Sequence, residues 1–410
     1  MVYAKQQQLD VAVREATCPA CGCYVAVPFL TKNWQPLATI AWPESAEVAR
    51  TMPRLPNDFV CCIDCGHIYN MAFDYATVPY SDKPNLMFNR GALWSSFIRH
   101  VQETMLVYLP ANPVVVEIGH GDGSFLAALA EAHPTGRFIG FDPNGAVAGH
   151  HLAEFRAEYF DPITHLPELR PDLIISRHVL EHLTNPLGFL QRLSFISALI
   201  GRPTLTYFEV PCVDRVFDTL RTVDFYYEHN SHFTTRSFTR MLERCPARIV
   251  EIGHGYDGEV VYGFMELVST PEQMETTWAA QRYFSATRES RQTIIRQLDN
   301  LHASGRSVAI WGGTGKSAAF LLRYQCDAER FPLVVDSDIV KVGTFVPGTG
   351  QEIRFRDWLI THPVDVVIIP PQWRARDIIA EMRREQISIG AILIEHNGQL
   401  VDFFAEEHPY

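Results

Sequence analysis

The chain has 410 residues, of which 47% are hydrophobic and 20% are charged, so it can bury sizeable cores and is not a disordered protein. Its formal net charge is −12, and its Lys and Arg residues form no cluster, which argues against nucleic acid as the main partner. The N-terminus lacks the apolar segment of a secretory signal, and no apolar run approaches the roughly 18 residues that span a bilayer. We therefore expect a soluble, cytoplasmic protein of two or three domains with no membrane partner.

Six of the nine cysteines lie within the first 65 residues, which are otherwise rich in short apolar runs and prolines. Two CxxCG knuckles, 40 residues apart, each present two sulfurs on a tight turn, and four thiolates suit a tetrahedral, structural zinc ion. The alternative pair Cys61/Cys65 fits the turn less well, and Cys23 is left as a bystander. The predicted zinc ligands are Cys18, Cys21, Cys62 and Cys65.

The rest of the chain alternates helical and strand-like segments. In the middle region, a helical pattern over residues 91–108 precedes VVVEIG, a continuous apolar run typical of a buried parallel strand. A long helical segment then ends at Gly305, and a second alternating region follows it. We predict an α/β protein with doubly wound sheets, divided into a zinc-binding module, a central domain, a linking helix and a C-terminal Rossmann-like domain at residues 1–88, 89–270, 271–304 and 305–410.

A glycine-rich turn follows the first strand of the central domain. Its sequence is Glu117-Ile-Gly119-His-Gly121-Asp-Gly123, and Asp142 closes the next predicted strand 19 residues later. Glycines allow a tight turn and close approach of a ligand, while an acid after the second strand commonly receives ribose hydroxyls in nucleotide-binding folds. The strand, turn, helix and acid together indicate a nucleoside-containing cofactor.

This pattern resembles class I S-adenosylmethionine (SAM)-dependent methyltransferases. The resemblance implies that Glu117 and the glycines at 119, 121 and 123 hold the methionine end of SAM, that Asp142 holds the ribose, and that Tyr159 or Phe160 lies near the adenine. The stretch SRHVLEHL resembles the segment after the fourth strand of these enzymes and contains His178 and His182. A role for His178 at the cofactor and simple packing of either histidine are equal alternatives.

The order of the parts resembles the sugar C-methyltransferases, which act on nucleotide-linked keto-deoxysugars. The likeness covers essentially the whole chain and includes CIDCGHIYN, EIGHGDG, the YYEH segment at 226–229, and WGGTGK with the later DSDIVKVG. It implies a fold class: a class I methyltransferase Rossmann-like core with a small N-terminal zinc-binding module and a C-terminal Rossmann-like lobe. It also implies SAM as cofactor and a nucleotide-sugar as the small-molecule substrate.

The third motif carries the expected chemistry. The family pattern is Tyr-x-Glu-His, usually with a His at the second position, where this chain has Tyr227. Carbon becomes nucleophilic once a base removes a proton next to a carbonyl and a donor stabilises the enolate. We expect His229 to be the base, Glu228 its partner and Tyr226 an enolate donor. Tyr80, in the linker after the cysteine module, is an additional catalytic candidate, with simple packing as the equal alternative.

The C-terminal lobe contains WGGTGKS, which lacks the first glycine of a Walker A motif. The spacing Gly313-x-Gly315-x-x-Ala318, with Asp336 21 residues after Gly315, leaves NAD(P) binding open. The family resemblance instead implies that this lobe helps to hold the nucleotide-sugar diphosphate. Lys316 at a helix N-terminus and Lys341 are the substrate-binding candidates, and Lys341 is equally compatible with a solvated loop.

Two other functions stay open at this point. The departures from the family motif permit methyl transfer to oxygen or nitrogen of another small metabolite on the same three-domain scaffold. A binding protein with an inactive glycine turn is the third possibility, although the intact series of acid, glycines and acid argues against it.

Overall fold

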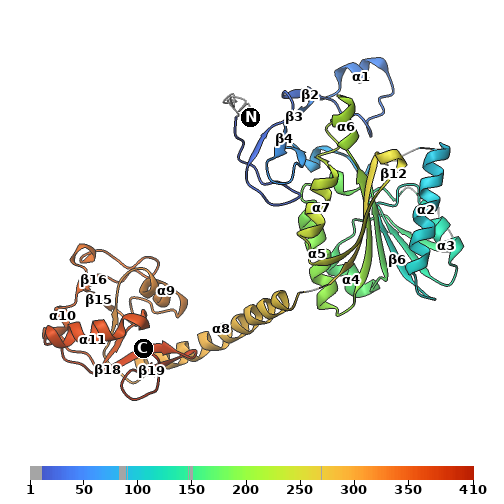
Figure 1. Ribbon diagram of the computed structural model, residues 1–410. Helices are drawn as coiled ribbons and strands as arrows, with labels where there is room; N and C mark the ends of the chain where they lie inside the picture. Colours follow the sequence, from blue (N-terminus) through green and yellow to red (C-terminus); the bar gives the residue numbers. More distant parts are fainter. Residues whose placement is uncertain (1–11, 83–88, 90, 146, 148–150, 269) are drawn as a thin grey trace, which may run out of the picture. The chain divides into compact units, whose positions relative to one another are not determined.

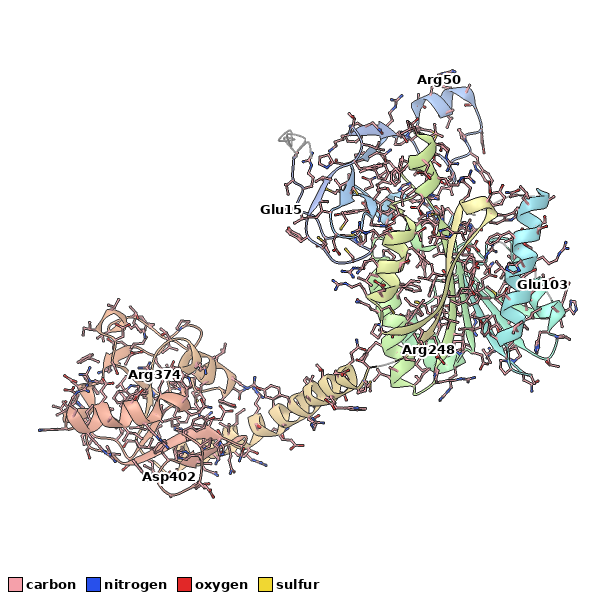
Figure 2. All side chains as sticks on the ribbon, in the orientation of Figure 1. Glu15, Arg50, Glu103, Arg248, Arg374 and Asp402 are labelled. Carbon is pink, nitrogen blue, oxygen red and sulfur yellow. The ribbon has the colours of Figure 1, made fainter. Side chains whose placement is uncertain are left out.

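A computed structural model describes residues 12–82, 89, 91–145, 147, 151–268 and 270–410 of the protein. The chain forms two compact units, Met1–Pro271 and Glu272–Tyr410, which are described separately (Figure 1). Figure 2 shows the side chains of both units, with charged residues such as Glu103 and Arg374 at the outside. The confirmed fold class is α/β, with mainly parallel sheets in both units.

The first unit is built around a seven-stranded sheet with the order β12-β13-β10-β9-β6-β7-β8. Neighbouring strands run parallel, except that β13 is antiparallel to both β10 and β12. This arrangement is the open, doubly wound sheet that the alternation of segments predicts. The strands are β6 Val114–Ile118, β7 Arg137–Phe141, β8 Ala153–Arg156, β9 Leu173–Arg177, β10 Thr204–Pro211, β12 Ala247–Gly255 and β13 Val260–Leu267.

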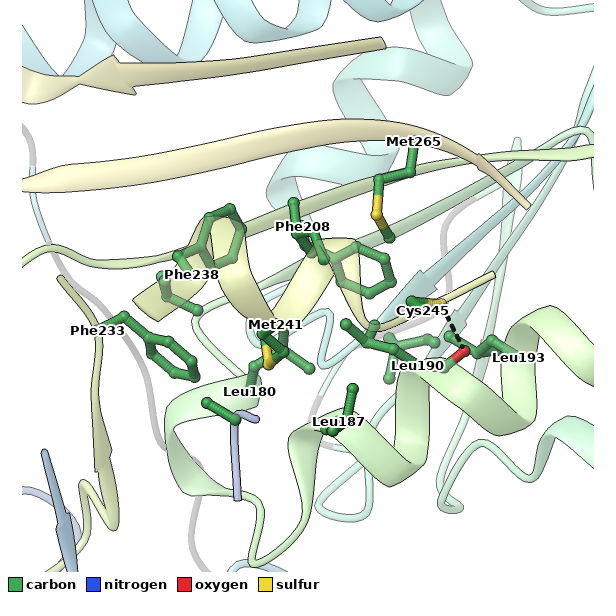
Figure 3. Close-up of a cluster of buried hydrophobic side chains, with 14 of the residues drawn as sticks. Leu180, Leu187, Leu190, Leu193, Phe208, Phe233, Phe238, Met241, Cys245 and Met265 are labelled. Carbon is green, nitrogen blue, oxygen red and sulfur yellow. Dashed lines mark hydrogen bonds between the residues drawn. The ribbon is translucent and has the colours of Figure 1, made fainter. Parts of the chain in front are cut away.

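Helices cover both faces of this sheet (Figure 1). Strand β10 shows why two cores form: Tyr207 packs in the core beside α2 and α3, while the next residue, Phe208, packs in the core beside α4, α5 and α7. In Figure 3, Phe208 meets side chains from α5 and α7, including Leu190 and Met241. The helices are α2 Ala92–Tyr108, α3 Ser124–Ala132, α4 Pro162–Leu169, α5 Pro186–Leu199, α6 Asp214–Thr219 and α7 Thr235–Glu243, with 3-10 turns η2 Leu180–His182 and η3 Tyr256–Gly258.

The N-terminal module shares a sheet with the central domain. Its four-stranded sheet has the order β1-β4-β5-β11, and β11 comes from residues Ser231–His232, far along the chain. Ser231 pairs with Tyr69 and His232 with Ile68. The N-terminal module and the central domain therefore belong to one compact unit. The boundary between them that the sequence predicts, after residue 88, stays a prediction. The other elements are β1 Ala26–Pro28, β2 Asn33–Gln35, α1 Ala46–Thr51, β3 Leu55–Asn57, β4 Phe59–Cys62, β5 Ile68–Asn70 and η1 Tyr75–Thr77.

The second unit begins with the long helix α8, Pro271–Ala303, whose Ile294 and Leu298 are buried against a six-stranded sheet. The sheet order is β16-β15-β14-β17-β18-β19, parallel apart from β19. The strands are β14 Val308–Trp311, β15 Leu333–Asp336, β16 Ile353–Phe355, β17 Val366–Ile368, β18 Ala391–His396 and β19 Gln399–Asp402. The helices are α9 Lys316–Arg323, α10 Trp358–Thr361 and α11 Ala375–Arg384, with 3-10 turns η4 Ile339–Lys341 and η5 Gln372–Arg374. Across the described residues of both units, no helix combines the length and apolarity that a membrane crossing requires.

The core beside α5 and α7 yields a stability prediction. Phe208 is fully buried at the centre of the sheet, whereas Phe195 lies on the outer face of α5 and is 37% exposed. We expect Phe208→Ala to lower the free energy of unfolding by about 3–5 kcal/mol, because it removes buried apolar surface and leaves a cavity. Phe195→Ala should change it by less than about 1 kcal/mol. Urea denaturation followed by circular dichroism measures both, and equal losses in the two variants would contradict this account of the core.

Candidate functional site

The glycine turn connects β6 to α3 in a conformation that requires glycine. Gly119, Gly121 and Gly123 all have positive φ angles, of 75°, 56° and 74°. A Cβ atom at Gly119 would lie 2.3 Å from Cγ2 of Val179, and one at Gly123 would lie 2.8 Å from the ring of Phe155. The turn therefore brings backbone close to neighbouring side chains, as the sequence motif predicts.

A cavity of about 710 Å³ opens at the carboxyl ends of β6, β7 and β9. Ligands of doubly wound sheets bind at this edge, and the volume is that of a small-molecule site. Most of the predicted cofactor residues line it, whereas Gly123 starts α3 behind the turn. The lining members of that set are Glu117, Gly119, Gly121, Asp142, Tyr159, Phe160 and His178, joined by the catalytic candidate Tyr80.

Glu117, at the end of β6, presents a buried carboxyl group to this cavity. Its side chain is 2% exposed, and Oε2 has no hydrogen-bond partner among the described residues. Burial raises the pKa of Glu117 to about 8, although the nearby guanidinium of Arg177 acts in the opposite direction. An unpartnered carboxyl at this position fits an incoming ammonium group, such as that of the methionine part of SAM.

Next to Glu117 lies a buried polar network that sequence reasoning did not find. Arg177 and His178, at the end of β9, contact the carboxylate of Glu209 in β10 at 3.3 and 2.9 Å. Burial alone would lower the pKa of His178, but its contacts with the carboxylates of Glu181 and Glu209 raise it to about 9. The sequence contained one indication of this network, namely that Glu209 is a polar residue near the carboxyl end of an apolar strand.

The other end of the cavity carries the predicted nucleoside contacts. Asp142 follows β7, and its Oδ2 accepts a hydrogen bond of 3.2 Å from the backbone N–H of Gly121. Phe160 is buried and packs edge-on against Phe141 at 5.1 Å, whereas Tyr159 is 54% exposed at the cavity. Their roles toward ribose and adenine stay predictions.

The YYEH segment places two of its side chains beside the cavity wall. The hydroxyl of Tyr226 lies 2.9 Å from Nε2 of His229, whose ring packs at 4.8 Å from the ring of His182. The hydroxyl of Tyr80 lies 2.9 Å from Nδ1 of His182, and both of these residues line the cavity. The structure thus gathers Tyr80, Tyr226 and His229, and adds His182, for which sequence reasoning gave packing equal weight.

The electrostatics of this group favour neutral side chains. Burial lowers the pKa of His229 well below its usual value, and the nearby rings of His182 and His232 lower it further. Burial also raises the pKa values of Tyr80 and Tyr226 above the usual phenol range. At neutral pH the imidazole of His229 is therefore able to accept a proton, while both phenols keep theirs and act as donors.

Glu228 differs from the expected arrangement. Its carboxyl Oε1 accepts hydrogen bonds from the backbone N–H groups of Ala38 and Thr39, at 2.6 and 2.7 Å. The ring of His229 instead contacts Tyr226, His182 and His232. The carboxyl group of Glu228, which stands in a turn, thus binds the N-terminal module.

Four cysteines converge in the N-terminal module as predicted. The sulfur atoms of Cys18 and Cys65 are 3.7 Å apart and those of Cys21 and Cys62 are 3.6 Å apart, and all four sulfurs lie within 4.8 Å of one another. A tetrahedral ion with zinc–sulfur bonds of about 2.3 Å requires separations of about 3.8 Å, so the donor set fits zinc. Cys61 directs its sulfur to its neighbour's carbonyl, outside this group, which favours the Cys62/Cys65 knuckle.

The two lysines of the second unit occupy different settings. Lys341 pairs with Asp336 at 3.3 Å and with Asp338 at 3.6 Å. Lys316 begins α9, and its ammonium lies 5.6 Å from the ring centroid of Trp373. Their binding of a diphosphate stays a prediction.

Two protein-family models match the chain. Residues 92–252 match a methyltransferase domain, and residues 269–396 match a C-methyltransferase C-terminal domain. No curated protein sequence matches.

Several solved structures are similar to part of the chain. A SAM-dependent methyltransferase from Aquifex aeolicus is 15% identical, with 44% of this chain and 100% of that chain covered and a TM-score of 0.31. The plantazolicin methyltransferase BpumL in complex with a pentazolic desmethylPZN analog and SAH is 14% identical, with 43% and 84% covered and a TM-score of 0.33. Human N-acetylserotonin methyltransferase in complex with SAM is 13% identical, with 48% and 63% covered and a TM-score of 0.32.

The sheet order, the glycine turn beside the cavity and the matched domains define a SAM-dependent methyltransferase of the class I fold. Within that class, residues 269–396 match a C-methyltransferase C-terminal domain, and the prediction of a methyltransferase is confirmed.

The raised pKa of Glu117 predicts how SAM affinity depends on pH. The carboxyl is mostly protonated below pH 8 and must ionise to hold an ammonium, so affinity should fall as the pH decreases through this value. Between pH 8 and pH 6 the ionised fraction drops about 50-fold, and we expect the affinity to follow it. In Glu117→Gln the affinity should be weaker at pH 8 and nearly independent of pH. Calorimetric titration with SAM measures this, and a pH slope that survives in the variant would assign it to another group.

Proposed function

We propose that the protein methylates a carbon next to the ketone of a nucleotide-linked keto-deoxysugar, through an enolate. The observation that carries the proposal is a connected group of four side chains: Tyr80 and His182 line the cofactor cavity, and the ring of His229 packs against His182 and contacts the hydroxyl of Tyr226. This group offers one neutral base and two protonated phenols beside the place where SAM would bind. Proton abstraction next to a carbonyl needs a base and an enolate donor.

In this proposal, His229 takes the proton. Nε2 of the neutral ring accepts it as the carbon–hydrogen bond breaks, and the electron pair moves onto the enolate. The hydroxyl of Tyr226, which otherwise contacts Nε2, then donates to the enolate oxygen. A depressed pKa makes His229 a weak base, but it also keeps the ring neutral at neutral pH, so that it can accept a proton.

His182 and Tyr80 complete the wall on the cavity side. The Nδ1–H of His182 donates to the backbone carbonyl of Glu228 at 2.7 Å, which fixes the orientation of the ring. Tyr80 donates to the same carbonyl at 3.2 Å, so both rings are held in place against the cavity. When bound, SAM would supply the electrophilic methyl group: its bond to the sulfonium sulfur breaks as the enolate carbon attacks, and neutral S-adenosylhomocysteine is the leaving group. Holding the acceptor carbon in line with that methyl group is the contribution of the cavity walls.

The nucleotide-sugar part of the proposal has separate support. The motifs shared with sugar C-methyltransferases run through both units, and the second unit matches a C-methyltransferase domain. Lys316, at the N-terminus of α9, and Lys341, at the end of η4, are the candidate anion-binding residues of that unit.

We further propose that Cys18, Cys21, Cys62 and Cys65 hold a structural zinc ion. Four thiolates leave no open coordination position, so the metal would stabilise the module and take no part in the reaction.

The function is tested by separating enolate formation from methyl transfer. In D₂O, with S-adenosylhomocysteine in place of SAM, the wild type should exchange the α-proton of a nucleotide-linked 4-keto-sugar. Methyl transfer should occur with this substrate and not with its 4-hydroxy counterpart.

His229→Asn should lower both exchange and methyl transfer by about 10²–10⁴-fold, because it removes the base, while SAM binding stays unchanged. His100→Asn, on the exposed side of α2, is the matched control. Proton exchange that persists in the His229 variant would contradict the assignment. A product with the methyl group on oxygen or nitrogen would favour the alternative function.

The zinc site predicts a bound-metal stoichiometry. Purified wild-type protein should contain about one zinc ion per chain in native mass spectrometry, since the four sulfurs form one tetrahedral set. Cys62→Ser should lose the ion and lower the melting temperature, while Cys61→Ser, one position away, should keep both. Loss of zinc in the Cys61 variant would instead indicate the alternative knuckle.

A further inference from the structure

We propose that Glu228 is a positioning residue: its carboxyl group fastens residues 38 and 39 of the N-terminal module to the 226–232 segment, and this attachment sets the positions of Tyr80 and His229. The inference rests on the proposed function, which assigns proton transfer to His229. It changes the role that the sequence motif implies for Glu228, from partner of the base to anchor of the segment that carries the base.

The carboxyl group of Glu228 is bound in a way that suits an anchor. The residue is fully buried, and a single oxygen, Oε1, accepts from the backbone N–H groups of Ala38 and Thr39 and from the Thr39 hydroxyl at 3.2 Å. No Lys or Arg within the described ranges forms an ion pair with it. Oε2 is buried without a hydrogen-bond partner among the described residues, so the three neutral donors to Oε1 alone offset the cost of burying this group, and breaking their bonds would leave both oxygens unsatisfied.

The main chain of the same residue holds the cavity wall. The backbone carbonyl of Glu228 accepts hydrogen bonds from the hydroxyl of Tyr80 and from Nδ1 of His182, at 3.2 and 2.7 Å. Glu228 thus binds the N-terminal module through its side chain and binds two cavity-lining side chains, Tyr80 and His182, through its backbone carbonyl. A shift of Glu228 would move both rings.

Apolar packing connects the same two ends. Ile40, directly after the bound backbone, lies in a small buried cluster with Val78, Tyr80 and Tyr227. The hydroxyl of Tyr227 also accepts a hydrogen bond of 2.9 Å from the backbone N–H of Asp74. If residues 38 and 39 were released from Glu228, Ile40 would lose its restraint, and with it the support beneath Tyr80.

Comparison of Gln and Ala at this position distinguishes anchoring from an electrostatic role. A Gln side chain can still accept all three hydrogen bonds through Oε1, whereas Ala accepts none. For anchoring, we expect Glu228→Gln to keep kcat within about fivefold and Glu228→Ala to lose about 50-fold or more, with the KM for SAM unchanged in both.

The pH profile of kcat provides the readout that separates the two roles. For anchoring, the midpoint of its acid limb should be unchanged in Glu228→Gln. If Glu228 acts on His229 through charge, Gln should lose as much activity as Ala, and the acid limb should shift. That result would overturn the proposal, as would full activity of the Ala variant.

Hydrogen exchange gives a readout that needs no substrate. In Glu228→Ala, amide exchange should rise at residues 36–42 and 226–232, while Glu228→Gln should resemble the wild type. Thr39→Val, which removes one of the three donors, should show a smaller rise at the same peptides. Thr31→Val, at an exposed threonine of the same module, is the matched control.

If amide hydrogen exchange at these residues is unchanged in Glu228→Ala, the anchoring role of Glu228 is wrong, even if the enzyme is active. Absence of methyl transfer to keto-sugars by the wild type would overturn the proposed function and leave the exchange result standing as the test of the anchor.

Discussion

The site depends on one constraint: three neighbouring strands of a parallel sheet end in ionisable residues that are shielded from water. Glu117, Arg177 and Glu209 stand at the carboxyl ends of β6, β9 and β10, with Arg177 directly opposite Glu209 in the register. Isolated charges in such a place are very costly, so they must be paired or neutralised. Arg177 and His178 pair with Glu209 and lower its pKa to about 2 against the effect of burial. Glu117, which lines the cavity, is left with a raised pKa and with one carboxyl oxygen that has no hydrogen-bond partner among the described residues.

The backbone around this network has the geometry that a packed ligand site needs. His178 has a φ angle of 53°, which is uncommon for a residue with a Cβ and is held by the hydrogen bond of 2.9 Å from its N–H to the carbonyl of Glu209. That conformation turns the chain from β9 toward His182. The cofactor end and the proposed base end of the cavity are therefore linked through one short stretch after β9. A change in the charge network would therefore alter the position of His182 and, through the ring contact, that of His229.

The parts of this arrangement that are local in sequence could be predicted. The glycine turn, Asp142 and the CxxC knuckles carry their geometry in short motifs, because positive φ angles and close backbone approach restrict the residue types. The pairing of Glu209 with Arg177 and His178 could not be predicted, since nothing in the sequence fixes which strands become neighbours. The same applies to β11, whose two residues join the N-terminal sheet across about 160 positions of chain. The contact of Glu228 with residues 38 and 39 has this long-range character too, so the motif alone could not indicate where its carboxyl group binds.

The attachment of β11 explains why a cysteine-bearing module belongs in the same compact unit as the methyltransferase sheet. The 226–232 segment contributes no helix and only two strand residues, so its own hydrogen bonds cannot fix it. Strand β5 supplies a sheet edge on one side, and Glu228 supplies a second attachment on the other. A loop held at two points loses most of its freedom before substrate arrives, so little ordering free energy remains to be supplied on binding. By this argument the module would contribute to the proposed catalysis through rigidity: β4, which carries Cys62 of the cysteine cluster, pairs with β5, and β5 pairs with the strand that follows the proposed base.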